Sequence, residues 1–158
     1  MWKANDLHKV KRLNGVSMVV QSAAVRWTLT LLWTALTVYL MLSPSGEGTN
    51  VTWVSRLFGG TETTDAVGHV IINAILAFLW CWTISLYASI AKTTRLILIG
   101  GVTWCFAGEL SQLFVPGRGT SLLDLAANLL GVMIGLYSSR LFARIDKGAF
   151  DGGVDPCC

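Results

Sequence analysis

The feature that most constrains this chain is a series of four apolar runs, each close to the length of a helix that crosses a membrane. A spanning helix needs roughly 17–25 predominantly apolar residues. The runs cover residues about 24–42, 65–91, 96–115 and 121–142. Proline and glycine, which interrupt helices, follow the first and third runs at Pro44 and Pro116–Gly117. We therefore predict an all-α integral membrane four-helix bundle, formed by one transmembrane domain over residues 1–158.

The composition excludes most other classes of protein. Charged residues make up 13% of the chain and hydrophobic residues 53%, whereas a typical soluble domain carries about 25% charged residues. A soluble fold of this size needs a mostly polar surface, because small domains bury only part of their chain. An ordinary soluble enzyme, a disordered chain and a nucleic-acid binder with a basic surface are all excluded. The expected partners are membrane lipids, and no nucleic acid.

The placement of Lys and Arg predicts an orientation, since these residues concentrate on the cytoplasmic side of short loops. With four spans and the N-terminus inside, only Arg56 and Arg118 of the twelve basic residues lie outside. We therefore predict that both termini are cytoplasmic. The first span would lengthen toward Val19 if Arg26 reaches back to the interface. The alternative is that the first run is a cleaved signal peptide, which would leave three spans.

Polar residues that are costly inside a membrane recur at the same end of three spans. Ionisable residues in such positions are functional hypotheses by default. Each span carries a pair three or four residues apart, and therefore on one helix face. With Arg118 and Ser121 from the connecting turn, the predicted ligand-binding residues are Asp65, His69, Glu109, Gln112, Arg118, Ser121, Asp124 and Asn128. The topology places them in the outer leaflet.

Several of these residues also have a structural interpretation. Ser121 and Asp124 match a capping box at the start of the fourth helix, and Asp65 or Thr64 can cap the second. Asn128 can join helices through hydrogen bonds. Nothing local satisfies the carboxylate of Glu109, so it must pair with Arg118, share a proton or be neutral. We predict that Glu109 and Arg118 lie within salt-bridge or one-water reach.

The small, aromatic and sulfur-containing residues in the spans are expected to pack between helices. Gly131 and Gly135 form a small-xxx-small pair, which predicts a close helix contact. Trp80 and Trp104 lie too deep in their spans for the interface and are predicted to pack between helices, as are the thiols of Cys81 and Cys105. Cys157 and Cys158 would face the reducing cytoplasm, where we expect free thiols.

The segment from Glu109 to Gly131 resembles the VanZ-like family. It matches the pattern E-x-x-Q-x-F-x-P-x-R-x-x-S-x-x-D-x-x-x-N-x-x-G at every fixed position. The family also carries D-K-x-x-H at its second helix, where this chain has Asp65 and His69 but Ala66 in place of the lysine. Any role that needs a cation at position 66 is therefore in doubt. The resemblance covers the second to fourth spans.

The resemblance implies a small multi-pass protein of the bacterial cytoplasmic (inner) membrane with a role in the cell envelope. The family's namesake is associated with resistance to the glycopeptide antibiotic teicoplanin. No reaction follows from the resemblance, and we expect no metal and no cofactor.

Three functional hypotheses remain open. The first is a site for a lipid or glycan head group, with Arg118 contacting a phosphate or carboxylate. The second is a membrane enzyme in which His69 or Glu109 acts as acid or base, with or without a metal on carboxylates and His69. No HExxH motif is present. The third is a non-catalytic transmembrane subunit of a larger membrane protein complex.

Overall fold

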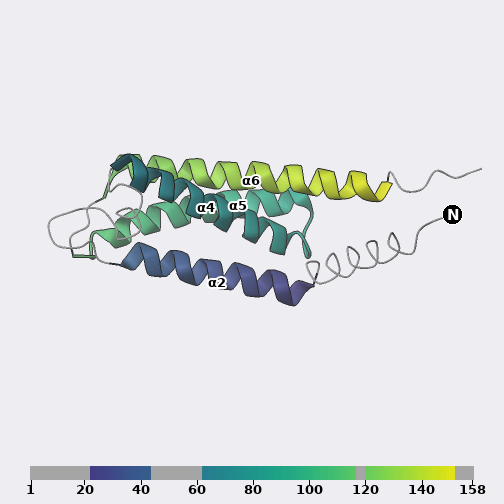
Figure 1. The fold of residues 1–158 in the computed structure, drawn as a ribbon, viewed down its shortest axis with the longest axis horizontal. Helices are drawn as coiled ribbons and strands as arrows, with labels where there is room; N and C mark the ends of the chain where they lie inside the picture. Colours follow the sequence, from purple (N-terminus) through teal and green to yellow (C-terminus); the bar gives the residue numbers. More distant parts are fainter. Residues whose placement is uncertain (1–21, 44–61, 117–119, 152–158) are drawn as a thin grey trace, which may run out of the picture.

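The computed structural model describes residues 22–43, 62–116 and 120–151, which form four helices (Figure 1). Labelled as in Figure 1, they are α2 (Ala23–Leu42), α4 (Glu62–Ile84), α5 (Ile90–Gln112) and α6 (Leu122–Asp151). The helices run side by side and alternate in direction (Figure 1). Each contains a stretch long and apolar enough to cross a membrane. The prediction of an all-helical chain with four helices of spanning length is confirmed for these residues, and the orientation of the termini stays a prediction.

The turn between α4 and α5 lies where the sequence predicted continuous helix. α4 ends at Ile84 rather than at residue 91, and α5 already begins at Ile90 rather than at 96. The amides of Tyr87 and Ala88 both donate to the carbonyl of Ile84, at 2.9 and 3.1 Å, and Ser89 is extended. This turn contains neither proline nor glycine, so hydropathy gave no stop signal. The other ends differ as well, because α5 stops at Gln112 rather than 115 and α6 extends past residue 142.

The bundle has apolar residues outside and many polar residues inside. Leu32 and Tyr137 are 64% and 69% exposed, while Thr30 and Thr83 are fully buried. The hydroxyls of these two threonines lie 2.8 Å apart, and that of Thr30 also donates to the carbonyl of Arg26. Such hydrogen bonds within and between helices are typical of membrane bundles, where lipid covers the outer surface.

α4 and α6 form the most extensive helix contact, and two glycines make it close. A Cβ atom added at Gly131 would meet the carbonyl oxygen of Val70, and one added at Gly135 would meet that of Ala74. Only hydrogen fits at these two positions. The predicted close contact at this glycine pair is confirmed, and α4 is the partner helix.

α2 is held to the end of α4 by Arg26. Its Nη1 donates to the carbonyl of Trp82 at 2.8 Å, and its guanidinium lies 4.5 Å from the centre of the Trp82 ring. Trp82 belongs to the last turn of α4, whose carbonyls have no partner within the helix. Arg26 therefore binds the end of a neighbouring helix, and its predicted place at the membrane interface stays a prediction.

The deep aromatic and sulfur-containing side chains pack as predicted. Trp80 donates to the hydroxyl of Thr34 on α2 at 3.1 Å. Cys81 and Cys105 are buried free thiols, 5% and 1% exposed. Cys157 and Cys158 lie outside the described residues.

Candidate functional site

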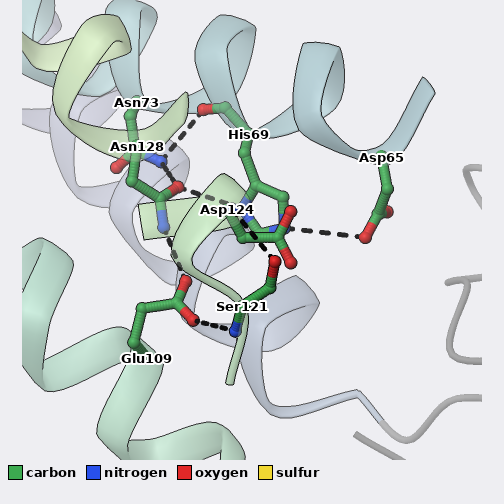
Figure 2. Close-up of polar contacts among 7 residues, drawn as sticks. All are labelled: Asp65, His69, Asn73, Glu109, Ser121, Asp124 and Asn128. Atoms are coloured by element: carbon green, nitrogen blue, oxygen red, sulfur yellow. Dashed lines mark hydrogen bonds and ion pairs between the residues drawn. The ribbon is translucent and has the colours of Figure 1, made fainter. Parts of the chain in front are cut away.

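Polar side chains from three helices meet at one end of the bundle, which we call the distal end: the end where α4 begins, α5 ends and α6 begins (Figure 2). We call the group the polar cluster, and its members are Asp65, His69, Asn73, Glu109, Ser121, Asp124 and Asn128. Six of these seven residues were predicted from the sequence. Their convergence follows from the antiparallel order of the helices.

The inner part of the polar cluster is sealed from its surroundings. Asn128 Nδ2 donates to Glu109 Oε1 at 3.0 Å, and the backbone amide of Ser121 donates to Oε2 at 3.3 Å. Glu109 and Asn128 are 5% and 2% exposed. The carboxylate thus joins α5 to the start of α6, and each of its oxygens accepts a hydrogen bond. Burial of a carboxylate is tolerated where donors satisfy it in this way.

The side-chain amide of Asn128 also fixes the orientation of the His69 ring. Asn128 Oδ1 accepts from Asn73 Nδ2 at 2.7 Å and lies 3.0 Å from His69 Nδ1. Because Asn128 presents its NH2 group to Glu109, its oxygen faces the imidazole. Nδ1 therefore carries the hydrogen, and Nε2 faces the opposite way. A chain of contacts from Glu109 through Asn128 positions the histidine ring, much as supporting residues orient histidines at metal and catalytic sites.

The outer edge of the polar cluster is accessible. His69 Nε2 lies 3.7 Å from Asp65 Oδ2, and the two side chains are 18% and 17% exposed. Asp124 completes this edge from α6, and one ligand atom from each of Asp65, His69 and Asp124 lies within 4.8 Å of the other two. Carboxylate and imidazole groups at such spacing can hold a cation, a protonated amine or the hydroxyls of a bound molecule.

The N-cap predicted for α6 at Ser121 is confirmed, and the cap predicted for α4 is wrong. Ser121 Oγ accepts from the backbone amide of Asp124 at 3.4 Å, and the Ser121 carbonyl accepts the first helical bond from Leu125. Ser121 is therefore the N-cap of α6. Asp65 is not the cap of α4, because that helix already begins at Glu62.

Three further residues complete the account of the site. Gln112 is 3% exposed at the end of α5, one turn beyond Glu109. Arg118 lies outside the described residues, so its predicted contact with Glu109 stays a prediction. Asn73 is not among the residues predicted from the sequence, although it continues the series Asp65, His69 at four-residue intervals. A search for polar residues along that face of α4 would have found it.

The fold and the polar cluster define a class: a multi-pass helical membrane protein with a partly buried polar site at one end of its bundle. No family model matches the chain, and no characterised protein or solved structure shows significant similarity to it. The resemblance to the VanZ-like family accordingly stays an expectation from the sequence.

Proposed function

We propose that the polar cluster binds the polar head group of a lipid or glycan in the outer leaflet of the bacterial cytoplasmic membrane, as part of a VanZ-like envelope protein. The observation that carries this proposal is the gradient of burial within the cluster. Glu109 and Asn128 are sealed, whereas Asp65 and His69 are accessible beside Asp124. A purely structural network gains nothing from an open edge, whereas a binding site requires one.

The chemistry of the accessible edge favours a ligand that donates hydrogen bonds. Asp65 and Asp124 offer carboxylate oxygens, and the Nε2 atom of His69 faces the same space. Sugar hydroxyls and the ammonium group of an ethanolamine head group are donors of the required kind. Arg118, from the turn before α6, would contact a phosphate or carboxylate of the same head group.

The sealed residues have a positioning role in this proposal. Asn128 fixes the ring of His69 through Nδ1, and Glu109 holds Asn128. A site preorganised in this way loses less entropy when the ligand binds. Ser121 contributes as the N-cap of α6, which places Asp124 at the edge.

Lipid selection in a bilayer of known composition tests the proposal. The protein is reconstituted in nanodiscs with equal amounts of phosphatidylethanolamine and phosphatidylglycerol, and the lipids retained on release are identified by native mass spectrometry. We expect enrichment of phosphatidylethanolamine, lost in D65N and in D124N. D151N, the same change at the other end of α6, serves as the matched control. Equal retention of both lipids by the wild type and both folded variants would overturn the proposal.

A second candidate function is supported by the same edge. The ligand atoms of Asp65, His69 and Asp124 lie within 4.8 Å of one another, and two carboxylates with one imidazole suit a divalent metal with open positions for substrate. The protein would then be a membrane-embedded enzyme. Titration with Mn²⁺, followed by electron paramagnetic resonance, tests this candidate. Stoichiometric binding abolished by H69Q supports it, and absence of bound Mn²⁺ at millimolar concentration contradicts it.

A further inference from the structure

A small pocket lies at the end of the bundle opposite the polar cluster, which we call the proximal end: the end where α4 ends and α5 begins (Figure 1). The pocket has a volume of about 50 Å³ and is partly open to the surface. A single water needs about 10–15 Å³ of such space, so a group of a few heavy atoms, such as a phosphate, fits. α4, α5 and α6 all contribute to the wall, whose polar side chains include Ser85, Thr94, Ser139 and Arg140.

Arg140 is the charged group of this pocket, and one of its nitrogens is held in place. Its Nε donates to Thr94 Oγ1 on α5 at 3.4 Å, and the residue is exposed. The bond directs the planar guanidinium from α6 toward α5. The terminal N–H groups have no acceptor among the residues that the structure describes. Arginine presents such groups as a fork that matches two oxygens of a phosphate.

The charge around the pocket is positive. The helix segments that surround it, residues 80–96 and 138–145, contain no aspartate or glutamate, and their basic residues are Lys92, Arg95, Arg140 and Arg144. The first amides of α5 have no partner within the helix, and the N-cap Ser89 makes no side-chain bond to them. These amides add to the positive potential that Arg140 provides. The pocket therefore suits an anionic group.

The depth of the pocket indicates that this group belongs to a lipid. From Asp65 in the polar cluster to Ser85 at the pocket, the chain rises roughly 30 Å along α4, which is about the thickness of the hydrocarbon core of a bilayer. When the polar cluster lies at one head-group layer, the pocket lies at the other. Ile90 and Phe142, which also line it, are 44% and 45% exposed. Such apolar side chains beside the charged group suit the chains of a lipid.

We propose that this pocket binds the phosphate of a phospholipid in the leaflet opposite the polar cluster. Arg140 supplies the charged fork, and Thr94 orients it. Basic pockets between membrane helices are typical sites for lipid phosphates. Phosphatidylglycerol and phosphatidylethanolamine both carry this phosphate diester. The pocket is separate from the polar cluster, so this inference does not rest on the proposed function.

Binding of dioleoyl phosphatidylglycerol to the purified full chain in dodecyl maltoside tests the role of Arg140. Affinities are measured by native mass spectrometry. We expect R140Q to bind about tenfold more weakly, the effect of losing hydrogen bonds from a charged donor. R95Q is the matched control and should bind as the wild type does, because Arg95 is also exposed but lies outside the pocket wall. Equal losses in R140Q and R95Q, or no loss in R140Q, would overturn the proposal.

A pair of isosteric variants tests the orientation of the guanidinium. Thr94→Val removes the acceptor of Arg140 Nε and keeps the shape of the side chain, so binding should weaken several-fold. Thr103→Val is the control on the same helix, because the hydroxyl of this exposed residue donates to the carbonyl of Ile99. Helicity should stay unchanged in both. Equal binding by the two variants would overturn the positioning role of Thr94.

Two further probes identify the source of the phosphate. Dioleoylglycerol has the same chains without the phosphate, and R140Q should bind it as the wild type does. A difference there would show that Arg140 acts on the fold rather than on a phosphate, and would overturn the proposal. Inorganic phosphate in large excess should not displace the phospholipid, because it lacks the chains that lie beside Phe142. Displacement would identify a site for a soluble anion and overturn the assignment to a lipid.

Discussion

Asn128 Nδ2 donates to Glu109 Oε1 at 3.0 Å, and this bond lies between two residues that are almost completely buried. The two side chains come from α6 and α5, and the other end of the Asn128 amide faces His69. One amide group therefore connects the buried carboxylate to the accessible imidazole. Most of the behaviour expected of the polar cluster follows from this connection.

Substitutions at Glu109 and Asn128 should have non-additive effects on the free energy of unfolding. We expect Glu109→Gln to lower the free energy of unfolding by about 1–3 kcal/mol, because one of its two donors then faces an NH2 group. Asn128→Ala should lower the free energy of unfolding by a similar amount. In a double-mutant cycle, measured by denaturant unfolding in mixed micelles, the coupling should exceed about 0.5 kcal/mol. Strict additivity would show that the bond contributes nothing to the fold.

The close contact between α4 and α6 should not tolerate a methyl group. Gly135→Ala places a Cβ against the carbonyl of Ala74 and the side chain of Ala77, so the unfolding temperature in detergent should fall. Gly68→Ala is the matched control, because a Cβ there meets no atom within 4 Å. A helical Gly-to-Ala change without clashes is expected to stabilise by up to about 1 kcal/mol. Equal effects of the two substitutions would contradict the described packing.

A change from arginine to lysine should lower the unfolding temperature more at Arg26 than at other basic residues. Its guanidinium donates to the Trp82 carbonyl and stacks on the Trp82 ring, and a lysine cannot reproduce both contacts. We expect Arg26→Lys to lower the unfolding temperature, whereas the same change at the exposed Arg95 leaves it unaltered. Hydrogen exchange should also show faster exchange in α2 of Arg26→Lys. Unchanged exchange and stability would show that α2 does not depend on this contact.

The topology predicted from the basic residues can be tested through the terminal thiols. Cys157 and Cys158 should react with a membrane-impermeant maleimide only after the cells are permeabilised, because the charge distribution places the C-terminus in the cytoplasm. Cys81 and Cys105 are buried and should stay unlabelled in both conditions. A variant with Ser at positions 157 and 158 provides the background signal. Labelling of Cys157 and Cys158 in intact cells would invert the topology and contradict an outward-facing site.

Much of the fold was predictable because its signals are local. Apolar runs predicted the four helices of the described residues, and Gly131 with Gly135 predicted a close helix contact. The turn after Ile84 was not predictable, since Leu86 and Tyr87 continue the apolar pattern through it. Tertiary structure alone decides where such a helix ends.

The sequence predicted most of the residues that form the polar cluster, but not which of them bond to one another. Polar residues at one end of three spans had to converge once the helices packed antiparallel, and Asp65, His69, Glu109 and Asn128 do so. Their partners depend on the rotation of each helix, which no spacing in a single sequence determines. The contact between Arg26 and Trp82, and the hydrogen bond from Asn73 to Asn128, are therefore findings of the structure alone.

The most direct test of the account is photocrosslinking of a head-group lipid to the protein in a bilayer. Phosphatidylethanolamine with a diazirine on its head group is incorporated into nanodiscs, and the crosslinked peptides are mapped by mass spectrometry. Head-group binding at the polar cluster predicts adducts concentrated at the start of α4 and the start of α6, and their loss in D65N and D124N. Adducts spread evenly over the lipid-facing helix ends, or unchanged in both variants, would contradict it.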